Sequence, residues 1–244
     1  MSTKVLSVGG SIIAPASPDT DFLSSFANMA CAWLQKDKSN RLVLVAGGGA
    51  PARLYQEAYR KVAASYEDFV KKALSFPSDK ELNEACDWIG ITATRLNAQI
   101  LKSVFGPLCK SSVVIDPTAA PDDFEGQVLV AAGWKPGFST DNDAVLLAEK
   151  YKADTVVNLS NIEKVYTADP RKDPDAKPID SISWADFRKM VGDEWVPGKN
   201  CPFDPIASKK AQELGLTVIC AGGKNIANIS SILDGKNYVG TTIN

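Results

Sequence analysis

The feature of this sequence that most restricts its fold is a series of short apolar runs alternating with helical patterns. The runs are rich in Val, Ile and Leu and cover 4–8, 42–46, 112–115, 127–131, 154–159 and 217–221. Patterns of helical period cover 19–36, 50–64, 87–105, 142–151, 204–214 and 225–233. Runs that are apolar on both faces and alternate with helices are typical of a parallel sheet covered on both sides. The sequence therefore predicts an α/β fold with a mostly parallel central sheet.

Two segments carry more specific expectations. Helix 87–105 has few polar residues, and most of these are small, so we expect it to be largely buried. The stretch 65–86 contains Pro77 and clustered charge, which predicts a mobile lid or a subunit contact.

The length of 244 residues suits one α/β domain covering 1–244.

The charge balance and the cysteines restrict the partners and the compartment. The net charge of -2 indicates neither a nucleic acid nor an anionic membrane as partner. The cysteines number five, an odd count without a CxxC pair, which favours reduced thiols. No run approaches the roughly 20 apolar residues that cross a bilayer. We therefore expect a cytoplasmic protein.

The chain contains no histidine, and this excludes several kinds of chemistry. A Ser/His/Asp triad, an HExxH metal site and a histidine general base are all impossible. Phosphoryl transfer remains possible, because it depends mainly on positioning and on positive charge around the transferred group.

Glycine turns follow the first two predicted strands. Gly9 and Gly10 end the first run, and 47–49 are three glycines that precede a helix containing Arg53. Glycine lets the backbone turn its N–H groups closely toward a phosphate, and a helix N-terminus adds a favourable dipole. Since the carboxyl ends of parallel strands share one edge of a sheet, we expect both turns at one rim, where they would suit a polyphosphate. Each turn alone is equally consistent with a tight strand-to-helix connection.

A cluster of Ser, Thr and Asp opens the helix that follows 127–131. Residues 139–143 read Ser-Thr-Asp-Asn-Asp. Such a cluster can cap the helix and leave N–H groups facing an anion, although Asp143 is also consistent with a first-turn acid that complements the helix dipole. Beyond the next strand, Tyr166 and Asp169 lie in a long polar loop that would suit an adenine and a ribose or metal–phosphate contact.

Taken together, these segments resemble the motifs of one known family in order and spacing. They are SVGGSI at 7–12, VAGGGAPAR at 45–53, DWIGITATRLNA at 87–98, AAGWKPGFSTDNDA at 131–144 and NLSNIEKVYTADPRKDP at 158–174. The resemblance is to the archaeal-type uridylate kinases of the amino-acid kinase superfamily, and it covers nearly the whole chain. It implies a three-layer αβα sandwich that phosphorylates UMP with ATP and Mg²⁺. A lobe of about 1–132 would bind the acceptor and a lobe of about 133–244 would bind ATP. The resemblance also implies a homo-oligomer, often a hexamer.

The resemblance assigns site residues in three groups. The catalytic residues would be Asp141, Ser7 and Arg53. The ATP contacts would be Gly9, Gly10, Ser11, Gly48, Arg53, Ser160, Tyr166 and Asp169. The UMP contacts would be Gly47, Asp87, Gly133, Lys135, Pro136, Gly137, Ser139 and Thr140. No protein ligands for a metal are assigned, so Mg²⁺ would come with ATP.

Three departures from the family pattern keep alternatives open. Ser7 stands where many superfamily members have a catalytic lysine, Glu163-Lys164 replaces Asp-Gly, and Trp134-Lys135 replaces smaller residues over the acceptor site. One alternative is the same fold acting on another phosphomonoester or a small carboxylate. A second is a non-catalytic nucleotide sensor or storage protein. Ser7 favours the sensor, whereas Asp141 with Tyr166 and Asp169 favours the kinase.

Overall fold

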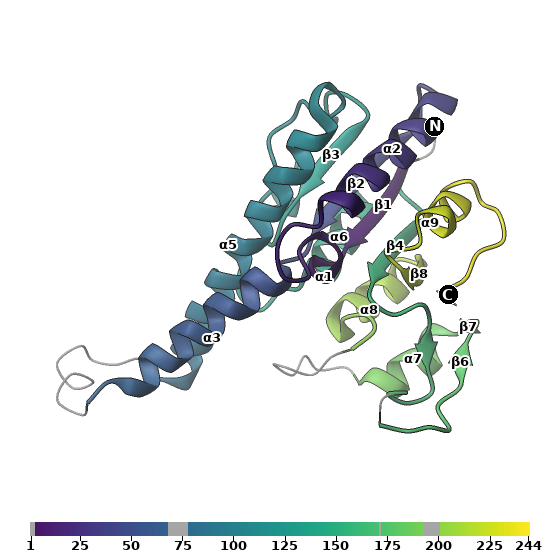
Figure 1. The fold of residues 1–244 in the computed structure, drawn as a ribbon. Coiled ribbons are helices and arrows are strands. Elements are labelled where there is room, and N and C mark those ends of the chain that lie inside the picture. Colours follow the sequence, from purple (N-terminus) through teal and green to yellow (C-terminus); the bar gives the residue numbers. More distant parts are fainter. Residues whose placement is uncertain (1–2, 68–77, 171, 193–200) are drawn as a thin grey trace.

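A seven-stranded sheet forms the centre of the molecule (Figure 1). The computed structural model describes residues 3–67, 78–170, 172–192 and 201–244. In spatial order the strands are β3 (Val128–Ala131), β2 (Arg41–Ala46), β1 (Thr3–Val8), β4 (Thr155–Ser160), β8 (Thr217–Gly222), β9 (Thr241–Ile243) and β7 (Ser181–Ile182). Every neighbouring pair is parallel except β8 and β9. The predicted α/β fold with a mostly parallel sheet is confirmed.

Helices cover both faces of this sheet and bury two separate apolar layers. One face is covered by α2 (Thr20–Lys36), α5 (Asp79–Phe105) and α9 (Ile226–Leu233), with the short α1 (Gly10–Ile13) at its edge. The other face is covered by α6 (Thr140–Lys150), α7 (Trp184–Val191) and α8 (Pro205–Glu213). Alternate residues of β1 enter different layers, since Leu6 and Val8 face the first and Val5 faces the second. The result is the three-layer αβα sandwich.

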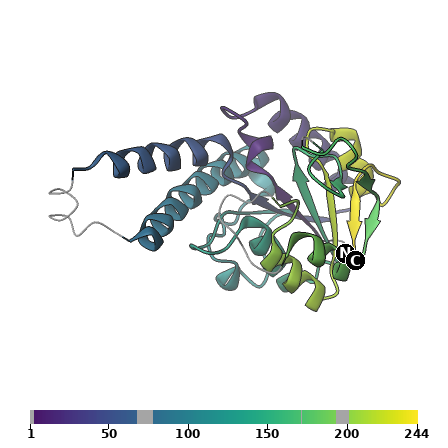
Figure 2. The ribbon, with the colours of Figure 1, turned by 90° about the horizontal axis from the view of Figure 1, so that it is seen from below.

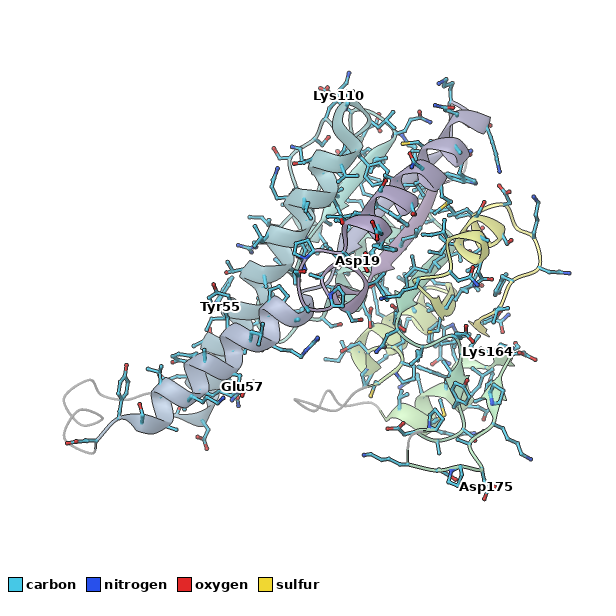
Figure 3. The ribbon with its side chains drawn as sticks, in the orientation of Figure 1. Asp19, Tyr55, Glu57, Lys110, Lys164 and Asp175 are labelled. Carbon is cyan, nitrogen blue, oxygen red and sulfur yellow. The ribbon has the colours of Figure 1, made fainter. Side chains whose placement is uncertain are left out.

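Helices α3 (Gly49–Ser65) and α5 lie side by side and extend beyond the sheet as a paired arm (Figures 1 and 2). Tyr55 and Glu57 lie on α3 along this arm (Figure 3). On α5, Trp88 is 44% exposed and Leu96 is 68% exposed. The expectation that helix 87–105 is largely buried was therefore wrong, because only the face toward α3 and the sheet is covered.

Two other sequence expectations were also wrong. The run 112–115 contributes only an isolated bridge between Val114 and Ala131, since Asp116 caps a 3₁₀ turn at Pro117–Ala119 and ends the extended segment. Helix α5 begins at Asp79 rather than at 87, because Ser78 and Glu81 form a capping box. The remainder of the proposed lid or subunit contact, 68–77, lies outside the described residues.

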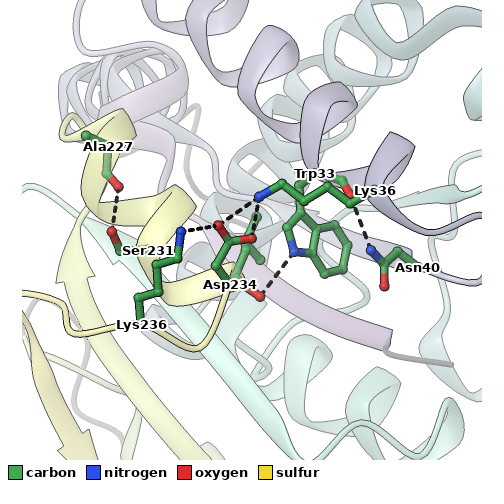
Figure 4. A network of polar contacts seen from close by, with 8 residues as sticks. Trp33, Lys36, Asn40, Ala227, Ser231, Asp234 and Lys236 are labelled. Atoms are coloured by element: carbon green, nitrogen blue, oxygen red, sulfur yellow. Dashed lines mark hydrogen bonds and ion pairs between the residues drawn. The ribbon is translucent and has the colours of Figure 1, made fainter.

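A polar network joins α2 to α9, two helices far apart in the sequence (Figure 4). The indole N–H of Trp33 donates to the carbonyl of Leu233 at 3.1 Å. The ammonium of Lys36 lies 2.6 Å from a carboxylate oxygen of Asp234, and that of Lys236 lies 3.2 Å from the other. This network ties the end of α9 to the end of α2 on the same face of the sheet.

Two short strands, β5 (Val165–Tyr166) and β6 (Pro178–Ile179), form a separate antiparallel pair beyond the end of β4. Across the described part of the chain, no helix combines the length and the apolar character needed to cross a membrane.

Candidate active site

The strand order changes direction between β1 and β4, and the candidate site lies at the carboxyl ends of these strands. The chain proceeds from β1 to β2 and β3 on one side, whereas β4 and β8 follow on the other. Such a switch point leaves a crevice beyond the strand ends, where open α/β sheets bind ligands. The N–H of Gly9 donates to the carbonyl of Leu159 at 2.8 Å, which joins β1 to β4 just beyond the last paired residues, Val8 and Leu159.

The two glycine turns lie against each other at this rim. A Cβ added at Gly10 would lie 1.9 Å from the backbone N of Gly49, and one added at Gly47 would lie 2.3 Å from the N of Gly10. Gly49 also has φ +68, in the left-handed region that favours glycine. The prediction that both turns share one rim is confirmed. Only glycine fits at this contact between backbones.

Helix α5 supports the second glycine turn and the loop at Gly133 through two side chains that the sequence reasoning missed. The amide Nδ2 of Asn97 donates to the carbonyls of Gly47 at 2.7 Å and Gly48 at 3.1 Å. Thr94 Oγ1 accepts from the N–H of Gly133 at 2.8 Å. Because Thr94 and Asn97 are three residues apart, they lie on one face of the helix. That spacing, within the run TRLNA, was the available signal.

A cavity of about 310 Å³ opens beside these turns, between α3, α5 and the start of α6. Seven of the predicted site residues line it: Gly48, Arg53, Asp87, Gly133, Gly137, Ser139 and Thr140. The other lining residues are Gly49, Ala52, Gln56, Gly90, Ile91, Thr94 and Phe138. One cavity therefore joins a phosphate-type glycine turn to a carboxylate.

Asp87 is the carboxylate of this cavity. Its Oδ2 accepts from the N–H of Gly137 at 3.3 Å, which links α5 to the loop 133–139. Burial raises the pKa of Asp87, while the bond from Gly137 opposes that shift. The half-buried carboxyl has acceptor capacity left for hydroxyl groups of a ligand.

Ser7 near the end of β1 and Asp141 in the first turn of α6 form a polar pair. The Ser7 hydroxyl donates to Asp141 Oδ1 at 3.0 Å, and the backbone N–H of Asp204 donates to Oδ2 at 3.3 Å. Burial raises the pKa of Asp141 to about 6, and the nearby Asp204 carboxylate contributes in the same direction. No cation is bonded to Asp141 among the described residues. Its charge thus remains available to organise groups that arrive with a ligand.

At the start of α6, one residue caps the helix and another is a buried carboxyl. Ser139 is the N-cap, because its Oγ accepts from the N–H of Asn142 at 3.2 Å. Asp143 is 1% exposed, and its Oδ2 accepts from the N–H of Trp134 at 3.2 Å. Burial, together with the charges of Asp141 and Asp116, raises the pKa of Asp143 to about 7. Asp143 is therefore a buried carboxyl beside the site and more than a solvated first-turn acid.

The raised pKa of Asp143 predicts a pH-dependent contribution to stability. The folded protein holds this proton more tightly than the unfolded chain, whose aspartates titrate near 3.9. The contribution is therefore complete below about pH 4 and is lost as the pH rises to about 7, with a ceiling of about 4 kcal/mol. Urea unfolding at pH 5 and pH 8 should show a smaller decrease for Asp143→Asn than for the native chain. Parallel decreases in both proteins would contradict this assignment.

Several predicted site residues lie outside the lining of the cavity. Lys135 has its ammonium 3.8 Å from the ring centre of Trp134 and 5.0 Å from that of Phe138. Ser160 ends β4 and accepts from the N–H of Ile162 through Oγ, and Tyr166 lies in β5. The structure does not bring Ser11, Pro136, Ser160, Tyr166 or Asp169 into this cavity. Their assigned contacts remain predictions.

Known proteins resemble this chain in both sequence and structure. The sequence pattern of the Amino acid kinase family matches residues 2–222. The uridylate kinase of Methanospirillum hungatei is 34% identical over 100% of this chain and 95% of its own, and that of Pyrococcus abyssi is 30% identical over 98% of each. The crystal structure of uridylate kinase from Archaeoglobus fulgidus superposes with a TM-score of 0.79 at 31% identity over 100% of both chains. The UMP kinase of Ureaplasma parvum, at 16% identity and a TM-score of 0.66, shares the fold.

Proposed function

This chain belongs to the amino acid kinase family, and from that premise we propose that it transfers the γ-phosphoryl group of ATP to UMP, giving UDP and ADP. Its full-length similarity to uridylate kinases identifies it as an ATP-dependent phosphotransferase. The identity of the acceptor rests on the full-length similarity to uridylate kinases and on the chemistry of the cavity.

The observation that carries the proposal is the continuity of the cavity between two chemically different ends. Gly48, Gly49 and Arg53 form one end, and Asp87 with Gly137 forms the other. Backbone N–H groups and an exposed guanidinium suit phosphates. A carboxylate suits the two hydroxyls of a ribose. A nucleoside monophosphate matches both ends, with its ribose at Asp87 and its phosphate meeting the phosphates of ATP at the glycine turns.

In this proposal the protein acts mainly by positioning and electrostatics. Gly9, Gly10 and Gly48 lie along the ATP phosphates, with the N–H groups of Gly10 and Gly48 as donors, because that of Gly9 is bonded to Leu159. Arg53 neutralises charge on the phosphates. Gly47 and the loop 133–140 hold the acceptor phosphate and nucleoside, with Asp87 on the ribose. Asp141, on the Ser7 side of the site, orients the cationic groups around the transferred phosphoryl.

Mg²⁺ is proposed to enter with the ATP phosphates. Within the described ranges, no group of three or more acidic, Cys or His side chains could hold a metal ion. This fits Mg²⁺, which usually keeps several waters and binds through substrate phosphates with one or two carboxylates. When bound, the ion would neutralise charge on the β- and γ-phosphates.

The remaining assignments complete the proposal. We place the acceptor in a lobe of about 1–132 and ATP in a lobe of about 133–244, with Ser160, Tyr166 and Asp169 holding the adenosine. The loop that carries Lys135 extends the acceptor site from the second lobe. A homo-oligomer, of which the hexamer is one form, is proposed from the family resemblance.

The two alternatives, an enzyme of the same fold with another acceptor and a non-catalytic nucleotide sensor, predict different outcomes in one assay. The experiment that tests the proposal is a coupled ADP-release assay with Mg²⁺-ATP and UMP, compared with CMP, AMP and small carboxylic acids. Turnover of a different acceptor would support the first alternative. Binding of ATP and UMP without turnover would support a sensor, for which Ser7 in place of lysine is the motivating feature.

Asp87→Ala is expected to weaken UMP binding about tenfold to a hundredfold and to leave ATP binding within about twofold. Removing a charged acceptor from ribose hydroxyls costs on the order of 1.5–3 kcal/mol. Calorimetric titration with each nucleotide measures the difference, and Glu57→Ala, an exposed carboxylate on α3, is the matched control. Equal losses for UMP and ATP would remove Asp87 from the acceptor end of the cavity.

A further inference from the structure

The peptide groups of Trp134 are held from two sides by polar side chains. Asp143 accepts from the backbone N–H of Trp134 at 3.2 Å. A guanidinium nitrogen of Arg95 donates to the backbone carbonyl of Trp134 at 3.1 Å. We call these three residues the Trp134 clamp. It fixes the first part of the loop 133–139, which forms one wall of the cavity.

The clamp connects the two helices that carry the site carboxylates. Arg95 lies on α5, two turns after Asp87, and Asp143 lies on α6, two residues after Asp141. The loop is further tied to α5 because the N–H of Gly137 donates to Asp87. A displacement of the Trp134 peptide would therefore change the placement of a ligand at Asp87 relative to Asp141.

Among the described residues, the clamp leaves two buried polar atoms without hydrogen bonds. Asp143 Oδ1 and Arg95 Nε are buried without a hydrogen-bond partner in the described structure. Besides burial, the carboxylates of Asp141 and Asp116 raise the pKa of Asp143, and neither can donate to it as an anion. Each unsatisfied buried group typically destabilises a fold, and native structures contain few of them. Two such atoms, on the residues that hold the two peptide groups flanking Trp134, indicate a positional function for this part of the loop.

The indole ring of Trp134 extends the clamp to the cavity wall. Its ring centre lies 4.8 Å from that of Phe138, and the ammonium of Lys135 lies over both rings. Phe138 lines the cavity and is 38% exposed. The position of the Trp134 backbone therefore also sets the position of its indole ring, and through that ring the position of Phe138 in the cavity wall.

We propose that Arg95 and Asp143 are positioning residues for phosphoryl transfer, which act through Trp134 to set the acceptor at Asp87 relative to Asp141. The proposal rests on the proposed function. Neither side chain needs to touch the substrate, because alignment of the reacting groups is sensitive to displacements of about 1 Å. The clamp should therefore affect turnover more than nucleotide affinity.

The test compares variants on both sides of the clamp. Asp143→Ala and Arg95→Met are expected to lower kcat about 100-fold, with the Kd of UMP and of ATP changed by less than about threefold. Asp143→Asn keeps an oxygen acceptor for the Trp134 N–H and is expected to retain at least about a third of kcat. Gln99→Ala, at an exposed position one turn further along α5, is the control and should match the native protein. Initial rates give kcat and KM, and calorimetry gives both Kd values.

Each outcome supports or overturns the clamp. A loss of kcat in Asp143→Ala that Asp143→Asn restores supports it. Native kcat in folded Asp143→Ala and Arg95→Met overturns it, as does a rise in KM for UMP at unchanged kcat. If Asp143→Ala does not fold, Arg95→Met alone decides. Absence of UMP turnover in the native protein would instead overturn the proposed function, which distinguishes the two failures.

Discussion

Asp141→Asn is expected to lower kcat for UMP phosphorylation about 100-fold or more and to leave the melting temperature within a few degrees. Asparagine can still bond to both groups, because its Oδ1 can accept from the Asp204 N–H and its amide can donate to the Ser7 hydroxyl, which is the donor to Asp141 in the native protein. Only the negative charge is lost. Preorganised electrostatic groups at the reacting centre are typically worth on the order of 2.7–4 kcal/mol.

The decisive comparison is between rate and stability. Initial rates at saturating ATP and UMP give kcat, and thermal unfolding gives the melting temperature. Asp186→Asn, an exposed first-turn acid on α7, is the control and should change neither. A lower melting temperature with unchanged kcat would show that Asp141 is only a structural residue at the start of α6.

Gly10→Ala is expected to have the largest effect on the fold, a loss of more than about 3 kcal/mol of unfolding free energy together with loss of ATP binding. An added Cβ would lie 1.9 Å from the backbone N of Gly49 and 2.6 Å from the carbonyl carbon of Gly48. Backbone atoms cannot rotate away as a flexible side chain can. The two glycine turns would have to separate, and they form the proposed phosphate site.

Gly222→Ala at the end of β8 provides a matched glycine control. A Cβ there would meet its nearest neighbour, Glu163 Cγ, at 3.4 Å, an ordinary van der Waals contact. Its unfolding free energy should change by less than about 1 kcal/mol. Chemical unfolding of both variants measures the difference. A Gly10→Ala protein with native stability and ATP affinity would contradict the close packing of the two turns.

The parallel sheet could be predicted from sequence because its strands are buried on both faces and read as continuous apolar runs. β9 and β7 could not, since strands of three and two residues carry too little periodicity. The N-terminal extension of α5 was missed although Ser78 and Glu81 carry the capping-box signal. The exposure of Trp88 and Leu96 could not be predicted, because sequence alone does not show which face of the α3–α5 arm lacks a neighbour.

The predicted site was recovered where backbone geometry determines it. Glycines at the ends of adjacent parallel strands must meet at one rim, so Gly10 and Gly47 could be placed together from the strand pattern. Asn97 and Asp143 were not assigned site roles, because their function depends on partners 50 and 9 residues away in the chain. The three-residue spacing of Thr94 and Asn97 shows that they share a helix face, but the partners of such tertiary contacts cannot be identified from the sequence.

The most direct test of the central claim is a coupled ADP-release assay with Mg²⁺-ATP and UMP. We predict rapid ADP release that requires UMP, forms UDP in equal amount, and is much slower with CMP, AMP or small carboxylic acids. ADP release at the same low rate with and without UMP, from a folded protein that binds ATP, would contradict it.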